Sequence, residues 1–382
     1  MQVFSRKNML LSVLCATSLE SKAWASKMLP PFETYLGTRS AGMAGASAAV
    51  ADDENAIFSN PAGIGQEDEP SLILRGFSVP NISLGIDRKA YKFLGSIESG
   101  SNNFKQVENL FSPEEKSALF FRGTTFPYVT VGRVQMGILM DATAQATQVT
   151  SNDVSGATWD RSLHAWQRSQ GGLVAGFSVP HRDSGISAGL TARYAFRTSY
   201  FEDVNITGAT IDRTESRVNR TRGLAIDGGL LIEPSQRYLW LPGLGISVRD
   251  VGNTVYKGTG AADEAEIEKS NLMVAARWKL VPGKKSDTQV LFTVEGHHLN
   301  DSRVPESDKL RIGSEIRLGE RAAKTPFAFR VGHNMRGFSY GGSIDLLILR
   351  LEAGSMVEGI PTAAGTFLDR RNFVRLSVDL RN

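Results

Sequence analysis

Residues 185–200 read GISAGLTARYAFRTSY, and their side chains alternate between two kinds. The apolar set ends in aromatics and comprises Ile186, Ala188, Leu190, Ala192, Tyr194 and Phe196. The polar set comprises Ser187, Thr191, Arg193, Arg197 and Ser199. Because successive side chains of a β-strand point to opposite faces, the stretch predicts a strand with one apolar and one charged face. The apolar face suits lipid, and the charged face suits a water-filled lumen.

The same alternation recurs in residues 272–280, 289–295, 309–318 and 374–381. It predicts that the charged side chains of these strands face the lumen, among them Arg193, Arg197, Arg277, Glu295 and Glu315. A soluble β-sandwich also alternates, so the pattern by itself leaves a soluble all-β protein open.

The first 25 residues have the three parts of a signal peptide. Arg6 and Lys7 give a positive start, residues 9–17 form a short apolar run, and Ala23-Trp24-Ala25 supplies the small residues of a cleavage site. The apolar run is shorter than the ~20 residues that span a bilayer. Cys15, the only cysteine, lies in this run, so we expect a mature chain without thiol or disulfide chemistry.

After residue 25 no stretch has the length of a transmembrane helix, so a membrane-embedded chain must form a closed β-barrel. The alternation predicts fourteen strands, at residues 71–87, 126–133, 135–149, 165–179, 185–201, 222–233, 243–251, 268–281, 287–298, 308–318, 326–334, 338–345, 347–354 and 371–381. An even number of strands places both ends of the chain on the periplasmic side. We therefore expect a barrel domain over residues 71–382.

The connections between these strands are alternately short and long, which is typical of outer-membrane barrels. The long ones are expected at residues 89–125, 151–164, 202–221, 250–267 and 354–370. Two features fit less well: Pro80 requires a kink or an edge position, and the turn near Asp345 has no glycine or proline. Ser112-Pro113-Glu114-Glu115 reads as the start of a helix that would continue over residues 117–121.

Residues 37–65, GTRSAGMAGASAAVADDENAIFSNPAGIG, do not alternate. Small side chains permit close backbone packing, and Asp and Asn can accept hydrogen bonds from backbone N–H groups and lumenal arginines. The composition favours a plug, or hatch, over residues 26–70 inside the barrel, with an N-terminal linker as the alternative. The expected hatch residues are Gly42, Gly45, Asp52, Asp53, Asn60 and Pro61. We expect Asp52, Asp53 and Asn60 to hold the hatch against lumenal groups such as Arg193 and Arg197.

This segment resembles the N-terminal hatch of the FadL-like outer-membrane proteins, a superfamily of long-chain fatty acid transporters, toluene and xylene channels and the PorV/PorQ group. The shared pattern is Gly37-x-Arg39, Gly42-Met43-x-Gly45-Ala46, Ala51-Asp52-Asp53 and Asn60-Pro61-Ala62. The phrases at residues 227–229, 251–253 and 330–334 carry a weaker likeness.

The resemblance implies a fourteen-stranded, plugged barrel in the outer membrane of a Gram-negative-type bacterium, through which hydrophobic small molecules diffuse passively. Its implied partners are outer-membrane lipid, a fatty-acid-like or aromatic ligand and the barrel assembly machinery. The last strand ends Leu380-Arg381-Asn382 without the aromatic residue common in such barrels. It looks more like the PorV/PorQ group, so a platform for secretion or for other envelope proteins stays an alternative.

The sequence gives no convincing catalytic motif, so we expect neither an enzyme nor a cofactor. The stretches at residues 176–180, 243–245 and 283–286 each lack a glycine that their nearest catalytic or phosphate-binding motif requires. His297 and His298 are adjacent on a predicted strand and should point to opposite faces, which disfavours a metal site. The net charge of +3 comes without a long run of Lys and Arg, so nucleic acid is not an expected partner.

Overall fold

The computed structural model describes residue 35 and residues 37–64, 74–87, 117–152, 159–181, 185–207, 210–234, 241–280, 288–319, 327–346, 349–362 and 365–379. The predicted signal peptide at residues 1–25, the helix start at residues 112–115 and the C-terminal residues 380–382 lie outside this part. The signal peptide therefore stays a prediction.

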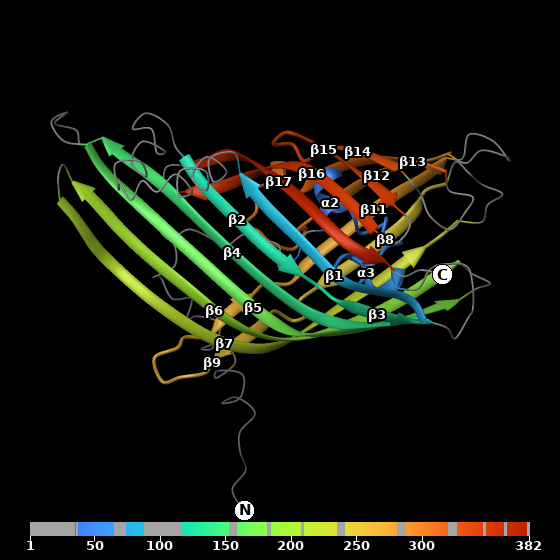
Figure 1. Ribbon diagram of the computed structural model, residues 1–382, viewed down its shortest axis with the longest axis horizontal. Helices are drawn as coiled ribbons and strands as arrows, with labels where there is room; N and C mark the ends of the chain where they lie inside the picture. The colour runs from blue at the N-terminus through green and yellow to red at the C-terminus, as the bar shows by residue number, and fades with distance from the viewer. Residues whose placement is uncertain are drawn as a thin grey trace, which may run out of the picture.

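Seventeen strands form a single antiparallel sheet that closes on itself (Figure 1). They are β1 (Leu74–Asp87), β2 (Ser117–Thr125), β3 (Tyr128–Val131), β4 (Val134–Asn152), β5 (Trp159–His181), β6 (Ile186–Thr207), β7 (Thr210–Ile232), β8 (Gly243–Arg249), β9 (Thr254–Gly258), β10 (Glu266–Glu268), β11 (Asn271–Leu280), β12 (Thr288–Gly296), β13 (Leu310–Leu318), β14 (Phe327–His333), β15 (Phe338–Leu346), β16 (Leu349–Thr362) and β17 (Gly365–Asp379).

Three pairs of consecutive strands lie end to end. β2 and β3 both pair with β1 and β4, β8 and β9 both pair with β7, and β10 and β11 pair with β9 and β8. Counting each end-to-end pair as one, the wall has the fourteen strand positions that the sequence predicts, which we name staves. β1 pairs with β17 to close the wall. Closure leaves no open sheet edge, which is the condition for a sheet to cross a membrane.

The two faces of the wall have opposite character. On β6, Leu190 is 48% exposed and faces outward, whereas Arg193 is 4% exposed and faces inward. Exposed aliphatic and aromatic side chains recur around the outer face, for example Leu173, Leu224 and Phe329. A soluble β-sandwich would bury the apolar face, so that alternative is wrong. A closed barrel with an apolar outer face and a charged inner face belongs in a bacterial outer membrane.

Several strands are longer than the alternation indicates. β5, β6 and β7 have 23, 22 and 23 residues, so most of the loops expected at residues 151–164 and 202–221 are strand. The long connection expected at residues 354–370 is also mostly strand, in β16 and β17. Polar composition suggested loops there, but pairing between neighbouring staves continues beyond the apolar band.

The helix expected over residues 117–121 is wrong, because Ser117–Thr125 is strand β2. The local capping signal is overridden by cross-strand pairing: residues 117–125 pair with β4 and residues 121–125 also pair with β1. Pro80 does lie at an irregularity, between Ser78 and Asn81 in the pairing of β1 with β17. The turn near Asp345 is confirmed, with β15 ending at Leu346 and β16 beginning at Leu349.

Residues 37–64, which we name the inner segment, lie inside the barrel (Figure 1). They include α2 (Thr38–Gly42), α3 (Ala56–Ser59) and the 3-10 helix η2 (Pro61–Gly63). α2 packs against β14 to β17 and η2 against β5 to β7, so the segment reaches opposite parts of the wall.

Candidate functional site

At several wall glycines the backbone of the inner segment packs directly against the wall. All of its residues are buried except Ser47, Asp52 and Asp53. A β-carbon added at Gly245 of β8 would lie 2.4 Å from the carbonyl oxygen of Ala48, and one at Gly332 of β14 would lie 2.4 Å from the carbonyl carbon of Met43. Wall glycines therefore make room for the backbone of the segment.

The expected hatch glycines, Gly42 and Gly45, also lie close to atoms of the wall. A β-carbon at Gly42 would lie 3.2 Å from the side chain of Arg330 and 3.3 Å from the backbone of Gly341. Gly45 has a φ of +88°, and a β-carbon there would overlap the guanidinium of Arg311. The positive φ favours glycine at position 45, and a larger residue would also have to displace the flexible end of the Arg311 side chain.

One cluster of charges joins the inner segment to β13. The Arg39 guanidinium lies 2.6 Å from both Asp52 and Glu315 and 3.2 Å from Asp53. Arg317 lies 3.1 Å from Asp52 and 2.5 Å from Glu315. The cluster is thus an alternating array of opposite charges shared between segment and wall.

The acids of this cluster titrate differently. Burial raises the pKa of Asp52, but Arg317, Arg39 and Arg277 outweigh it and hold that pKa well below 3.8. Burial raises the pKa of Asp53 above its ordinary value, because Arg39 opposes the burial less effectively there and the carboxylate of Glu54 adds to it. Asp52 therefore stays ionised to a lower pH than Asp53 does.

A second cluster joins the segment to β16 and β17. Glu54 pairs with Arg375, and its other oxygen lies 3.7 Å from Arg350. Arg375 also lies 3.2 Å from Glu352. The side chains of Glu54, Glu352 and Arg375 are at most 4% exposed, so these pairs are shielded from solvent.

Backbone groups of the segment are also held by the wall. Glu295 of β12 accepts hydrogen bonds from the N–H groups of Ser47 and Ala48, both at 2.7 Å. The Asn60 amide donates to the carbonyl oxygens of Ala48, Leu230 and Ile246, and its oxygen accepts from the N–H of Ala62. Pro61 follows at the first position of η2, where its missing N–H costs nothing.

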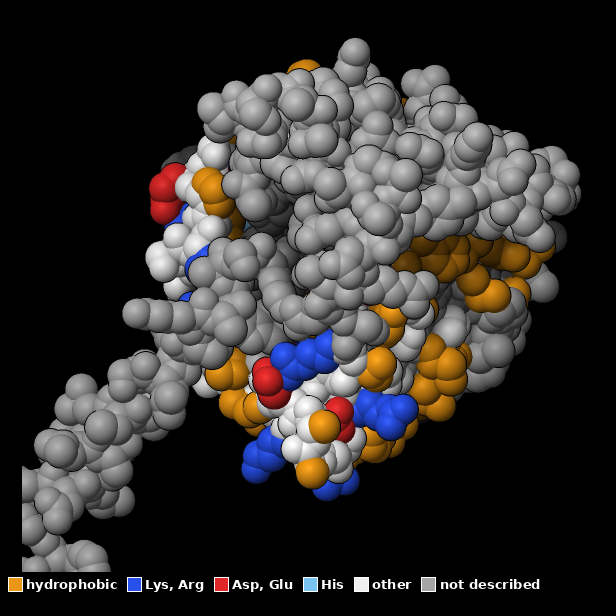
Figure 2. All heavy atoms as spheres, turned by 90° about the vertical axis from the view of Figure 1, so that its left-hand side faces the viewer, with side chains coloured by type: hydrophobic (Ala, Val, Ile, Leu, Met, Phe, Trp, Pro, Cys, Tyr) orange, Lys and Arg blue, Asp and Glu red, His pale blue; other side chains and the backbone are white. Residues whose placement is uncertain are grey.

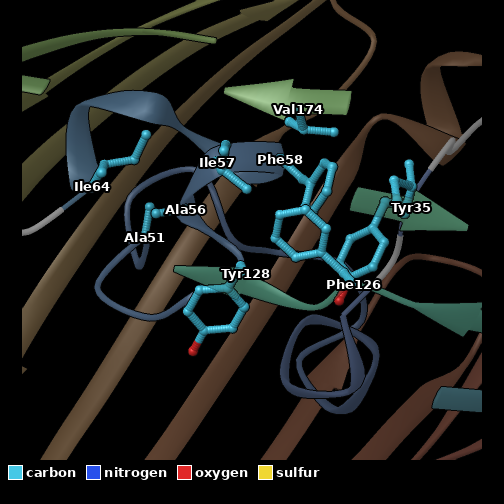
Figure 3. Close-up of a cluster of buried hydrophobic side chains, with 10 residues drawn as sticks. Tyr35, Ala51, Ala56, Ile57, Phe58, Ile64, Phe126, Tyr128 and Val174 are labelled. Carbon is cyan, nitrogen blue, oxygen red and sulfur yellow. The ribbon is translucent and has the colours of Figure 1, made fainter. Parts of the chain in front are cut away.

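Beside the charges lies a cluster of buried apolar side chains (Figure 3). Phe126, Tyr128, Leu139 and Val174 come from the inner face of the wall around β3 to β5. Tyr35 and Phe58 cover them: their rings stack at 4.2 Å, and Phe58 meets Phe126 edge-on at 4.7 Å. An apolar patch on the inner wall is therefore covered by the N-terminal part of the chain.

The expected contact of Asp52, Asp53 and Asn60 with Arg193 and Arg197 is wrong. Wall carboxylates already pair with these two arginines: Arg193 lies 2.9 Å from Asp227 and 3.1 Å from Asp250, and Arg197 pairs with Glu268. Arg277 likewise pairs with Glu233. All five predicted lumenal residues are buried, but only Glu295 and Glu315 bind the segment directly.

The sequence did not single out Arg39, Glu54 or the wall residues Arg317, Arg350 and Arg375 as partners in these clusters. Arg39 stands in the motif quoted above, and Arg317 and Arg375 stand on alternating charged faces. The pattern shows that such residues face inward, but it carries no information about which staves meet across the lumen.

Arg168 of β5 differs from the buried arginines described above, which pair with carboxylates. It is 4% exposed, and within the described residues its Nε and Nη2 atoms have no hydrogen-bond partner. Its guanidinium lies 5.4 Å from the ring centre of Trp166. Burying a guanidinium without a paired anion is costly, which makes this position a candidate contact for an acidic ligand group.

A small cavity of about 30 Å³ lies between the rings of Tyr35 and Phe58 and the charged wall around Arg193 and Asp250. That volume holds about two water molecules.

The prediction that His297 and His298 lie on a strand and point to opposite faces is wrong. β12 ends at Gly296, His298 has a φ of 52°, and the two rings meet edge-on at 4.4 Å. Across the described residues, no group of three His, Cys, Asp or Glu side chains is placed to hold a metal ion. Within the same ranges, no helix is long and apolar enough to cross a membrane.

No family model and no curated protein sequence matches this chain. Among solved structures, it is similar to the toluene transporter TodX of Pseudomonas putida, with 10% identity and a TM-score of 0.48 over 91% of this chain and 98% of that one. It is similar to a FadL homologue of Pseudomonas aeruginosa, with 11% identity and a TM-score of 0.26 over 94% and 100% of the chains. It is also similar to the transport unit of the autotransporter AIDA-I from Escherichia coli, with 9% identity and a TM-score of 0.31 over 88% and 98%.

Proposed function

We propose that the protein is an outer-membrane channel for the passive transport of hydrophobic small molecules, with the inner segment as its gate. The observation that carries this proposal is the apolar patch on the inner wall. Phe126, Tyr128, Leu139 and Val174 face a lumen whose other inward side chains are mostly polar or charged. A channel for water-soluble solutes has no use for such a patch, whereas a hydrophobic solute gains free energy by leaving water for it.

The gating role follows from what covers the patch. Tyr35 and Phe58 occupy the surface that a hydrophobic solute would use. The ion pairs of Arg39 and Glu54 hold the segment in that place. Breaking one buried pair costs roughly 3–5 kcal/mol, so thermal motion alone opens the gate rarely and an incoming solute competes with Phe58 for the patch.

Arg168 supports a class of solute that combines an apolar body with an acidic group. Its unpaired Nε and Nη2 atoms, in the described part of the chain, offer two donors to a carboxylate. An uncharged aromatic hydrocarbon would make no use of them. An Arg168→Gln variant should therefore slow the uptake of an acidic hydrophobic probe more than that of a neutral one.

The test of the proposal is uptake by liposomes that contain the purified protein. Deletion of residues 30–65 should raise the passive uptake of a hydrophobic dye such as N-phenylnaphthylamine. A heat-dependent shift in gel mobility would verify that the shortened barrel is folded. Uptake equal to that of the intact protein would contradict the gating role, and uptake equal to that of empty liposomes for both forms would contradict transport.

A platform for secretion or for other envelope proteins is the second candidate function. It is favoured by the length of β5 to β7, whose 23, 22 and 23 residues exceed the ~9–11 residues of a transmembrane strand by roughly 11. At ~3.3 Å per residue this excess is roughly 35 Å of strand. Purification in mild detergent separates the candidates: a stoichiometric protein partner supports the platform, and a lone barrel that holds a hydrophobic molecule supports the channel.

A further inference from the structure

On the outer face of β7 and β9, apolar side chains are followed by basic ones. Leu224 and Val255 are 58% and 45% exposed, and the next outward positions are the exposed cations Arg222, Arg220 and Lys257. Phe196 of β6, which is 54% exposed, pairs directly with Arg222, and Val218 beyond Arg220 is 47% exposed. Exposed cations among apolar side chains suit the zone where the hydrocarbon core of a bilayer gives way to lipid headgroups.

Arg222 and Lys257 lie directly opposite each other in the pairing of β7 with β9. Side chains at such positions have β-carbons about 4.5–5.5 Å apart, and like charges there are destabilising. In the described part of the chain neither side chain has a carboxylate partner. The nearby acids are engaged elsewhere, since Glu264 pairs with Arg217 and Asp263 accepts the backbone N–H groups of Arg220 and Gly260.

This basic surface faces the outside of the cell. It lies at the end of the barrel where β5, β6 and β7 project, opposite the end where β1 begins and β17 finishes. Outer-membrane barrels keep their short turns on the periplasmic side and their long hairpins outside. Figure 2 looks onto this projecting end and shows Lys and Arg side chains beside hydrophobic and a few acidic ones.

We propose that Arg220, Arg222 and Lys257 form a binding site for an acylated glycolipid of the outer leaflet that carries more than one phosphate group. The phosphates neutralise the opposed pair Arg222 and Lys257, and the acyl chains lie along Phe196, Leu224 and Val255. Arg222 and Lys257 are adjacent, and Arg220 lies two residues away on the same face of β7. Three cations so placed match several phosphates better than the single phosphate of an ordinary phospholipid. The site lies on the outer wall and is independent of transport through the lumen.

The test is a titration of the detergent-purified protein with diphosphoryl lipid A, monophosphoryl lipid A and phosphatidylglycerol, with bound lipid counted by native mass spectrometry. The variant is Arg222→Gln with Lys257→Gln. Since one cation near a charged lipid surface is worth about 1 kcal/mol, its loss should weaken binding of diphosphoryl lipid A by roughly fivefold per cation. The matched control is Arg303→Gln with Arg336→Gln, which removes the same charge from loops where each arginine pairs with an aspartate.

The proposal expects tight binding of diphosphoryl lipid A, weaker binding of the monophosphoryl form and an effect of the double variant but not of the control. Equal binding by the wild type and the double variant would overturn it. Equal affinity for phosphatidylglycerol and diphosphoryl lipid A would also overturn it, since the site would then take any anionic lipid. Gel mobility before and after heating verifies that each variant is folded.

Discussion

Adding one methyl group to the wall at Gly245 should loosen the inner segment without removing any charge. The new β-carbon would lie 2.4 Å from the carbonyl oxygen of Ala48 and 2.7 Å from the α-carbon of Ala49. Ordinary contacts begin near 3.4 Å, so the segment must move by about 1 Å. The Ala48 oxygen is also the acceptor for Asn60, so the shift weakens that hydrogen bond.

Overpacking of this kind costs roughly 1–3 kcal/mol. Because 1.4 kcal/mol corresponds to a tenfold change in an equilibrium constant, the undocked population should rise roughly 5- to 150-fold. The rise can be measured by thiol labelling. Cys15 is the only native cysteine and lies in the predicted signal peptide, so a Ser59→Cys variant would carry a single thiol in its mature form.

Ser59 is 5% exposed, so a thiol at that position reacts with a maleimide only when the segment leaves the wall. The thiol of the double variant Gly245→Ala, Ser59→Cys should therefore be labelled roughly 5- to 150-fold faster than that of Ser59→Cys alone. The matched control is Gly171→Ala on β5, where an added β-carbon meets nothing within 4 Å and labelling should keep its original rate. Equal rates for Gly245→Ala and Gly171→Ala would refute the idea that close backbone packing holds the segment.

Two further predictions concern the charges of the segment. Glu54→Gln leaves the buried Arg375 without its nearest carboxylate, which should cost about 3 kcal/mol and raise the rate of thiol labelling at Ser59→Cys roughly 100-fold. The control Glu306→Gln, on the surface, should leave the labelling rate unchanged. Similar rates for both variants would show that the Glu54 pair does not hold the segment. The contribution of Asp52 to docking is complete above pH 3.8 and is lost only as the pH falls through its lowered pKa, whereas protonation of Asp53, whose pKa is raised, favours docking. The labelling rate, divided at each pH by the rate of a free thiol such as glutathione, should therefore not increase from about pH 8 to about pH 5. An increase of this ratio over that range would contradict the charge assignment.

The strand pattern could be predicted because a barrel wall imposes one simple rule on every stave. In residues 186–196 each side chain is either in lipid or in the lumen, so polarity alternates with a period of two. The rule fails towards the end of β6. At residues 198–207 the alternation of polarity disappears from the sequence, which resembles a loop there although the strand continues.

The candidate site was predicted in composition but not in its contacts. Asp52 and Asn60 both lie at contacts with the wall, but Asp52 binds Arg39 and Arg317, and Asn60 binds backbone carbonyl groups. Arg193 faces the lumen as expected, but Asp227 and Asp250 on neighbouring staves already neutralise it. A lumenal arginine pairs with the carboxylate that lies nearest to it in the folded barrel. The order of residues along the chain does not give these distances.

The sequence by itself determined the number of strands and gave each strand one apolar and one charged face, because lipid and water act on each residue through its own side chain. Only the tertiary structure decided how residues 37–64 sit within the wall, which carboxylate meets which arginine, and that Arg222 and Lys257 stand side by side. Those outcomes depend on the closure and register of the barrel, which bring together residues far apart in the chain. The glycines at positions 245 and 332 show the difference: each is unremarkable in its strand, and each becomes necessary once the segment lies against it.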